Sequence, residues 1–418
     1  MIFVSHERQI ILISISTLLV VCIGTVLAVD ITDQRTSLDK GTMLNWFHAI
    51  RRFMFNFVGK TGLRTKGSFL QEKIPMNLPF PCNVSLGRSE RIPKSVHKLR
   101  PGDIYVIAAM GDSLTAASGA AATRVVDLSM ENRGLSWSIG GQWNWRNVTT
   151  LPNILKEFNP KLVGYSLGDS YAFHRDTQFN MAEVGAVSYD MPFMARSLVK
   201  RIRSDRRVNF KQDWKLVTIT IGGNDICSFV CTMQKPEDLP VKHRLRLISA
   251  LRYLRDNMPR TFVNLVSVPS VETVVSLKGK SAICKALHHG ECSCWIGKMF
   301  NQSDTSRARW HAIQARMVAV EAEVAQLDEF RRLDEFAVVY QPWTTNISLN
   351  MNGREVDYSL LAYDCFHMSQ KGNAYAGTAL WNNLMEPVGA KTRNWRPLFE
   401  DFRCPTQKAP YLYTYDNS

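Results

Sequence analysis

The 418-residue sequence has no internal repeat, no low-complexity segment and, after residue 29, no apolar run long enough to span a bilayer. These absences argue against a disordered, collagen-like or multi-span membrane chain. Hydrophobic residues make up 45% of the chain and charged residues 21%, which is the composition of an ordinary folded protein. The length allows one large α/β domain or two average domains.

The sequence also lacks a recognisable nucleic-acid-binding motif, although its formal net charge of +14 is strongly basic. A basic protein can be attracted either to nucleic acid or to an anionic membrane surface. Because the lysines and arginines are scattered along the chain, a membrane surface or a generally basic solvated surface fits better than nucleic acid. We therefore expect no nucleic-acid partner.

The longest apolar run lies at the N-terminus, from Ile10 to Val29, after a short opening that carries Arg8. Ala28 offers a small residue at which signal peptidase could cut. This pattern predicts a secretory leader over residues 1–29, with an uncleaved N-terminal signal anchor as the alternative. Both interpretations place the rest of the chain outside the cytosol, either secreted or tethered to a membrane. The C-terminal tail, residues 406–418, contains no segment long and apolar enough to act as an anchor.

Cysteine and glycosylation signals agree with an extracellular location. One of the nine cysteines lies in the leader, and the other eight form an even set suited to disulfides. These eight are Cys82, Cys227, Cys231, Cys284, Cys292, Cys294, Cys365 and Cys404. Their spacing leaves the pairing open, and a zinc site at Cys227 and Cys231, or in the 284–294 segment with His288 and His289, is an alternative. Asn-x-Ser/Thr triplets, which are glycosylated only in a secreted chain, begin at Asn83, Asn147, Asn301 and Asn346.

Strand-length apolar runs alternate with helical patterns from residue 80 onward. The apolar runs occupy 103–110, 216–221, 262–268 and 336–340, and the helical patterns include 242–258 and 308–327. This alternation predicts an α/β fold with a doubly wound, mostly parallel sheet. A helical stretch at 44–58 is amphipathic, and we expect it to pack against the body rather than to bind a surface. The predicted parts after the leader are a lead segment at 30–79, an α/β domain at 80–405 and the tail.

Polar residues follow the first two apolar runs, at the edge where ligands bind in such sheets. The tripeptide GDS at 111–113 places the Ser113 hydroxyl at the carboxyl end of the first run, beside backbone amides that can hold an oxyanion. The motif GGND at 222–225 follows the second run, and Asn224 supplies an amide donor. Taken singly, each motif is also ordinary turn or helix-cap chemistry.

Two further motifs complete a possible catalytic set. Gly140 and Gly141 form a small-residue loop whose backbone N–H could reach the same oxyanion, and we prefer Gly141. Near the end of the chain Asp364 precedes His367 by three residues, so that Asp364 can orient the imidazole while His367 faces Ser113 as general base. Paired glycines alone suggest a turn and an Asp–His pair suggests a surface pair, but all four motifs in this order point to acyl transfer.

Together these motifs resemble the four blocks of the SGNH/GDSL hydrolase superfamily, with Ser113, Gly141, Asn224 and His367 at the block positions. Longer stretches resemble the membrane-associated phospholipase B family. These are FPC at 80–82, SVHKLRPGD at 95–103, SWSIGG at 136–141, DCFH at 364–367 and ALWNNLMEPVG at 379–389. The likeness covers about residues 80–415, with a departure at Gln142, where this family is expected to carry an acidic residue.

The resemblance implies a three-layer α/β/α hydrolase that cleaves acyl esters of phospholipids and lysophospholipids without a metal or other cofactor. It implies Ser113 as nucleophile, His367 as base and Asp364 as its partner, with Ser113, Gly141 and Asn224 donating to the oxyanion. The implied partner is a lipid substrate at a membrane or micelle interface. Two alternatives stay open: an SGNH esterase acting on small or carbohydrate esters, and a catalytically inactive extracellular binding protein with the same fold.

Overall fold

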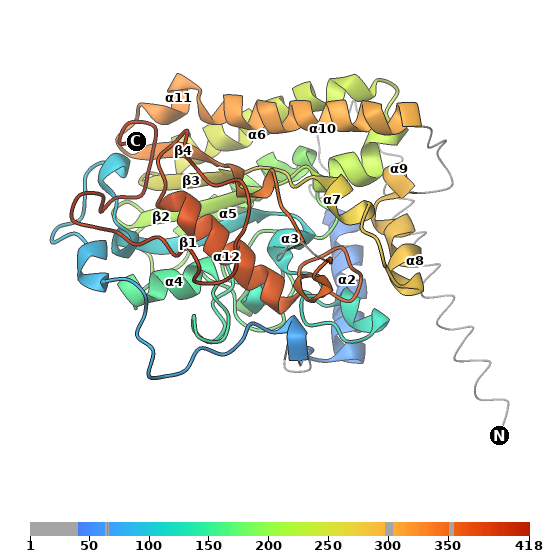
Figure 1. Cartoon of the computed structure of the whole chain (residues 1–418). Coiled ribbons are helices and arrows are strands. Elements are labelled where there is room, and N and C mark those ends of the chain that lie inside the picture. Colours follow the sequence, from blue (N-terminus) through green and yellow to red (C-terminus); the bar gives the residue numbers. More distant parts are fainter. Residues whose placement is uncertain (1–40, 63–64, 66, 297–303, 351–354) are drawn as a thin grey trace. The chain divides into compact units, whose positions relative to one another are not determined.

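A computed structural model describes residues 41–418 apart from 63–64, 66, 297–303 and 351–354 (Figure 1). The predicted leader and Asn301 therefore lie outside the described residues. The chain divides into two compact units, Met1–Phe47 and His48–Ser418. The second unit contains the tail and also the lead segment from His48 on, together with the predicted α/β domain. Within the described ranges, no helix has the length and apolar character needed to cross a membrane.

Four parallel strands form one sheet in the order β1-β2-β3-β4. They are β1 (Ile104–Gly111), β2 (Trp214–Thr220), β3 (Thr261–Val266) and β4 (Phe336–Gln341). Nearly every strand residue is buried, because both faces of a parallel sheet are covered by other elements. The four strands coincide with the four apolar runs to within a few residues, which confirms the predicted parallel α/β fold.

Two short segments, around residue 163 and over residues 179–183, pair with the other edge of β1 and together form an irregular edge strip. Val163 and Asn180 each form a parallel bridge with β1, and the Glu183 N–H donates to the Gly111 carbonyl oxygen at 3.2 Å. After β1 the chain therefore runs first along one side of this strand and then returns to form β2 on its other side. Such a change of direction opens a crevice at the carboxyl ends of the strands.

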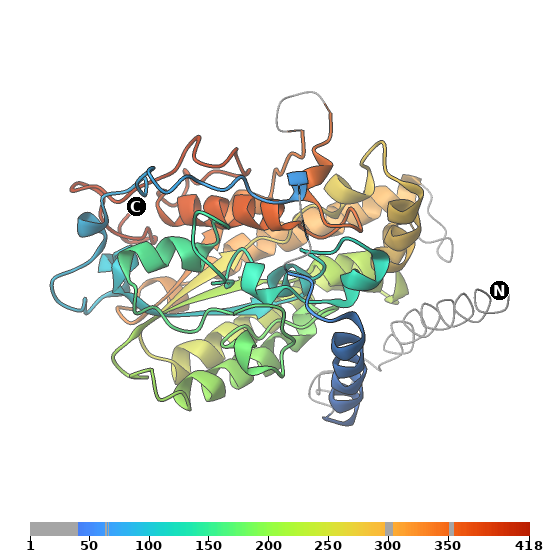
Figure 2. The ribbon, with the colours of Figure 1, turned by 90° about the horizontal axis from the view of Figure 1, so that it is seen from below.

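Helices cover both faces of this sheet (Figures 1 and 2). One face carries α5 (Met191–Arg203), α6 (Leu239–Asn257) and α10 (Asp304–Ala325), and the other carries α4 (Leu151–Phe158) and α12 (Gln370–Leu384). On the second face, Ile107, Leu216 and Phe262 of the sheet pack in one apolar core with Leu155 and Trp381 of the helices. Each such side chain contributes about 1.5–3 kcal/mol when fully buried.

The remaining helices are short, apart from the N-terminal one. They are α2 (Gly41–Val58), α3 (Ser113–Ala116), α7 (Val271–Val275), α8 (Ala282–Glu291), α9 (Ser293–Ile296) and α11 (Asp328–Arg331). Helix α2 forms where the amphipathic pattern at 44–58 predicts it. Within the second unit its Met54 and Val58 pack with Tyr171, and Arg51 Nη1 lies 2.5 Å from Glu183 Oε2. This part of the helix packs against the body, as expected.

Four disulfides use all eight cysteines that follow residue 29. The pairs are Cys82–Cys404, Cys227–Cys292, Cys231–Cys294 and Cys284–Cys365. The first joins residues separated by 322 positions, and the next two tie the segment after β2 to Cys292, which follows α8, and to Cys294 in α9. Because these sulfurs are bonded to each other, the thiolates that the zinc alternative requires are not available. The pairing fits an oxidising compartment.

Candidate active site

Ser113 begins α3 directly after β1, at the crevice formed by the change of chain direction. Asp112 caps this helix, and its Oδ1 accepts a hydrogen bond from the Leu114 N–H at 3.0 Å. Gly111 leaves no room for a side chain, because a Cβ there would lie 2.6 Å from the Thr220 carbonyl oxygen of β2. This tight turn at the sheet edge sets the position of the Ser113 hydroxyl.

Ser113, His367 and Asp364 form a continuous chain of hydrogen bonds. His367 Nε2 lies 2.9 Å from Ser113 Oγ, and His367 Nδ1 lies 2.7 Å from Asp364 Oδ2. The other oxygen of Asp364 accepts from the backbone N–H groups of Phe366 and His367, both at 2.9 Å. With Nδ1–H directed to Asp364, Nε2 keeps a lone pair for the Ser113 hydroxyl. The structure thus brings together the three residues that were expected to form the triad.

Burial and their mutual attraction shift the pKa values of His367 and Asp364. Burial disfavours the charged imidazolium, but the Asp364 carboxylate outweighs burial and raises the pKa of His367 to about 9. For Asp364, burial acts to raise the pKa, whereas His367 and the hydrogen bonds to the carboxylate bring it below its ordinary value. Burial raises the pKa of Asp112 to about 6. Asp364 is therefore ionised at neutral pH and makes His367 a strong base.

Asn224 reaches the same crevice from the carboxyl end of β2. Its side-chain amide donates one hydrogen bond to the Ala186 carbonyl oxygen at 2.8 Å, and a carboxamide carries a second N–H. Asn224 and Ser113 line the same cavity. The carboxylate of the next residue, Asp225, binds the segment that follows Ala186: it accepts hydrogen bonds from the N–H of Ser188 at 2.9 Å and from the Ser188 hydroxyl at 2.7 Å.

Gly141 is placed differently from the expectation, and the structure corrects its assignment as an oxyanion donor. Its N–H donates to the Ser166 carbonyl oxygen at 2.9 Å, and a Cβ at this position would lie 2.1 Å from the Tyr165 ring. Because its N–H is already paired with the segment at Ser166 and its Cα packs against Tyr165, Gly141 serves close packing. Paired glycines indicate a close approach but do not reveal which group approaches.

Gly185, which no motif of the sequence indicates, belongs to a segment that is hydrogen-bonded to the ends of β1 and β2 beside the crevice. It follows the edge strip in which the Glu183 N–H bonds to Gly111, and its neighbour Ala186 accepts the hydrogen bond of Asn224. Gly185 has φ +80°, a conformation that residues with a side chain rarely adopt. Gly185 therefore lies between the hydrogen bond that joins its segment to the end of β1 and the one that joins its segment to Asn224, after β2. The irregular strip before it has no continuous apolar run, so the pattern of strands did not point to it.

An apolar cavity opens from Ser113 and contains about 910 Å³ of empty space, including the part that is open to solvent. Aromatic and aliphatic side chains from several loops form most of its wall. They include Trp137, Val271, Val274, Trp343, Leu361 and Met368. A cavity with such walls and a few polar groups at the reacting end suits a hydrocarbon chain attached to a polar ester.

Among the described residues, one cluster of three possible metal ligands occurs, formed by Glu291, Asp364 and His367. Both ring nitrogens of His367 are engaged, one with Asp364 and the other with Ser113. A metal ion would therefore compete for the lone pair that receives the serine proton. Of the glycosylation candidates, Asn83 and Asn346 are exposed and Asn147 is half-buried. Their modification stays a prediction.

Relatives called "Phospholipase B1, membrane-associated" are 37% identical over 334 residues in Mus musculus and 38% over 338 residues in Homo sapiens. Each alignment covers 79% of this chain and 22% of the relative, so the chain spans about a fifth of the length of these proteins. An extracellular lipase from Streptomyces rimosus is a structural neighbour with a TM-score of 0.31 and 20% identity, covering 64% of this chain and 94% of its own.

A phospholipase A1 from Streptomyces albidoflavus NA297 also has a TM-score of 0.31, with 15% identity, covering 65% of this chain and 95% of its own. The family model of the GDSL-like lipase/acylhydrolases matches residues 107–380, which include Ser113, Asn224 and His367. This match extends over more than half of the chain and agrees with the resemblance seen in the motifs. The chain belongs to the GDSL-like lipase/acylhydrolase family.

Proposed function

We propose that this protein is a serine phospholipase and lysophospholipase that hydrolyses acyl esters of glycerophospholipids through an acyl-enzyme on Ser113. One observation carries the proposal: the Ser113–His367–Asp364 chain of hydrogen bonds ends at an apolar cavity. A nucleophile with its base supplies the chemistry of ester cleavage, and the apolar wall supplies a place for the acyl chain.

The reaction proceeds in two steps. In the first, His367 Nε2 takes the proton from Ser113 Oγ as this oxygen attacks the ester carbonyl carbon. The tetrahedral intermediate collapses, His367 returns the proton to the departing glyceryl oxygen, and the fatty acyl group stays on Ser113. In the second step, His367 takes a proton from water, the resulting hydroxide attacks the acyl-enzyme, and the fatty acid leaves as the proton returns to Ser113. Asp364 stays ionised throughout and stabilises the imidazolium.

Three N–H groups are proposed to hold the oxyanion: the backbone amides of Ser113 and Gly185 and the second side-chain N–H of Asn224. The hydrogen bond from Asn224 to Ala186 joins the segment after β2 to the segment of Gly185. The hydrogen bond from Glu183 to Gly111 joins the segment of Gly185 to the end of β1, next to Ser113. Donors that are already oriented before the reaction stabilise developing charge without further rearrangement.

A phospholipid is favoured over a carbohydrate ester because of the cavity wall. A sugar would need several hydrogen-bonding side chains, whereas the wall is dominated by residues such as Trp137, Trp343 and Leu361. Relatives named phospholipase B1 support the same choice. The four disulfides support the further proposal that the protein acts outside the cytosol, secreted or tethered through its N-terminal segment.

The test is the release of fatty acid from phosphatidylcholine and lysophosphatidylcholine by the purified protein, with and without chelator. The Ser113→Ala variant should lose this activity, whereas Ser204→Ala, which changes an exposed serine at the end of α5, should retain it. Cleavage that persists with chelator and disappears in Ser113→Ala supports the proposal. Cleavage of a short-chain ester alone would move the assignment to a small-ester or carbohydrate esterase, and no reaction with either substrate would favour an inactive binding protein.

A further inference from the structure

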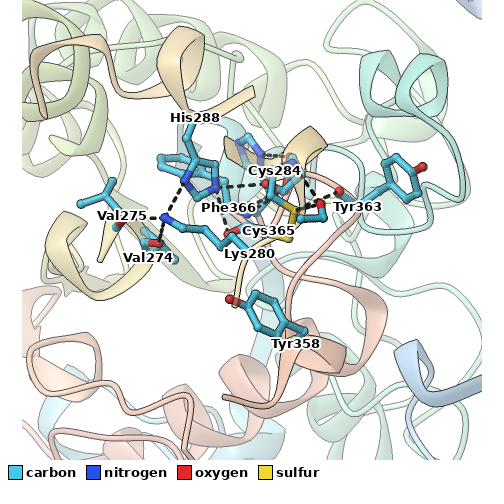
Figure 3. The surroundings of a disulfide bond; sticks show 12 residues. Val274, Val275, Lys280, Cys284, His288, Tyr358, Tyr363, Cys365 and Phe366 are labelled. Atoms are coloured by element: carbon cyan, nitrogen blue, oxygen red, sulfur yellow. Dashed lines mark hydrogen bonds and ion pairs between the residues drawn. A yellow bond between two sulfur atoms is a disulfide. The ribbon is translucent and has the colours of Figure 1, made fainter. Parts of the chain in front are cut away.

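One face of helix α8 supports the loop that carries Asp364 and His367 (Figure 3). Cys284 of the helix is bonded to Cys365 of the loop. One turn later, His288 Nε2 lies 3.1 Å from the Asp364 carbonyl oxygen and 3.2 Å from that of Cys365. Cys365 has φ +58°, a left-handed conformation that is costly for a residue with a side chain. The loop therefore depends on contacts from outside for its shape.

The surroundings of His288 define its hydrogen-bonding roles. His288 is fully buried, and burial together with the Lys280 cation lowers its pKa, so the ring is neutral. Lys280 Nζ lies 3.4 Å from His288 Nδ1 and also donates to the carbonyl oxygens of Val274 and Val275 (Figure 3). Because Lys280 can only donate, Nδ1 accepts and Nε2–H is directed to the loop carbonyls. The helix thus presents a donor to the catalytic loop.

Glu291 ends α8 on the same face, three residues after His288. One oxygen of its carboxyl group, one of Asp364 and a ring nitrogen of His367 all lie within 4.8 Å of one another. The Glu291 Oε2 atom is buried and has no hydrogen-bond partner among the described residues, so a polar atom at the end of α8 stands unpaired beside the triad. The next residue, Cys292, is bonded to Cys227, which holds this end of the helix beside the triad.

We propose that Glu291 is a positioning residue of the active site: its carboxyl stays protonated and donates a hydrogen bond to the Asp364 carboxylate, which in turn orients His367. The proposal adds a fourth, neighbouring side chain to the triad and rests on the proposed function of Ser113 and His367. Glu291 touches neither the nucleophile nor the substrate in this scheme, and it acts through Asp364.

Electrostatics favours the protonated form of Glu291. Burial is the largest cause that raises its pKa well above the ordinary value, and the Asp364 carboxylate is the next. The charged groups that act on Glu291 are Asp364 and His367, and the Asp112 carboxyl also acts on His367. Two adjacent carboxylates would repel each other, whereas an acid O–H beside a carboxylate forms a strong charge-assisted hydrogen bond. A single proton between the two groups satisfies both.

The experiment measures the rate at which a fluorophosphonate labels Ser113 in the full chain, from pH 5 to 10. The variants are Glu291→Gln, which keeps a neutral donor of the same shape, and Glu291→Met, which keeps the length and removes the donor. Glu291→Gln should label at nearly the rate of the unmodified chain, with the same inflection pH. Glu291→Met should label about 10- to 100-fold more slowly, because a hydrogen bond to a charged group is lost. Its inflection should also move to higher pH, because Asp364 then attracts the imidazolium proton more strongly.

Two results would overturn the inference. If Glu291 were ionised, Glu291→Gln would remove a negative charge near His367 and move the inflection to lower pH. If the residue only fills space, Glu291→Met would label like the unmodified chain. Glu237→Met, which changes an exposed glutamate paired with Arg309, is the matched control and should change neither quantity. Absence of labelling in the unmodified chain would refute the proposed function itself, so the two failures are distinguishable.

Discussion

Replacement of Asp364 by asparagine tests the electrostatic core of the proposed mechanism. The substitution keeps the size of the side chain, and the asparagine oxygen can still accept from the backbone N–H groups of Phe366 and His367 that shape the loop. It removes the negative charge that lies 2.7 Å from His367 Nδ1. It also offers an amide donor there, which favours the tautomer with the proton on Nε2 and leaves no lone pair for Ser113.

The size of the effect follows from the pKa of His367. Burial lowers this pKa, and the nearby carboxyl groups, Asp364 foremost among them, overcome burial and raise the pKa from 6.5 to about 9. At about 1.4 kcal/mol per pKa unit, the net stabilisation of the imidazolium is roughly 3 kcal/mol, equivalent to a factor of about 10² in rate. The wrong tautomer adds to this loss, and in the worked serine-protease triad the corresponding change lowers kcat by about 10⁴. We therefore expect a loss of about 10²- to 10⁴-fold for Asp364→Asn.

The assay is the hydrolysis of a soluble p-nitrophenyl ester between pH 5 and 10, together with a thermal melt. The inflection of kcat/KM should move from about pH 9 to near or below the ordinary value for histidine, because burial alone lowers the pKa of His367. Asp416→Asn is the control, since Asp416 forms a surface pair with His97. A loss of less than tenfold, with the inflection unmoved and the fold intact, would refute the reasoning.

Four further predictions concern other parts of the structure. In the unmodified enzyme, kcat/KM should rise with pH through about 9 as His367 loses its proton, which a pH–rate profile measures. The contribution of the raised His367 pKa to folding stability should be complete below about pH 6.5 and should disappear as the pH rises through about 9, which urea melts at several pH values measure. Asn224→Ala should lower kcat by about 10²- to 10³-fold with little change in melting temperature, as expected for a lost oxyanion donor, and steady-state kinetics would expose a smaller effect. Gly141→Ala should lower the melting temperature, because its new Cβ meets an aromatic ring at 2.1 Å, and normal stability with impaired catalysis would restore the oxyanion role first expected for it. Removing the bond between Cys82 and Cys404 by double alanine substitution should cost about 2–5 kcal/mol of unfolding free energy in denaturant melts while low-temperature activity persists.

Local properties of the chain made much of the fold and part of the site predictable. A buried parallel strand needs a short, continuous apolar run, and the runs that predicted β1 to β4 meet that need without reference to the rest of the molecule. Asp364 and His367 lie three residues apart, so their pairing is a short-range matter. Ser113 and Asn224 each follow such a run, and parallel strands end at the same edge of their sheet.

Contacts between distant segments decided the rest. Gly140 and Gly141 form a paired-glycine loop and Gly185 is a single glycine, so the local sequence favours the pair. Only the hydrogen bonds from Glu183 to Gly111 and from Asn224 to Ala186 show that the segment of Gly185 lies beside the crevice. The disulfide pairing and the contact of Glu291 with Asp364 also join segments that the chain brings together only when the sheet and α8 are assembled. A sequence pattern reports the conformation and burial that a segment prefers, because these depend on neighbouring residues. Which group lies opposite that segment depends on the packing of the whole domain, and only the tertiary structure determines it.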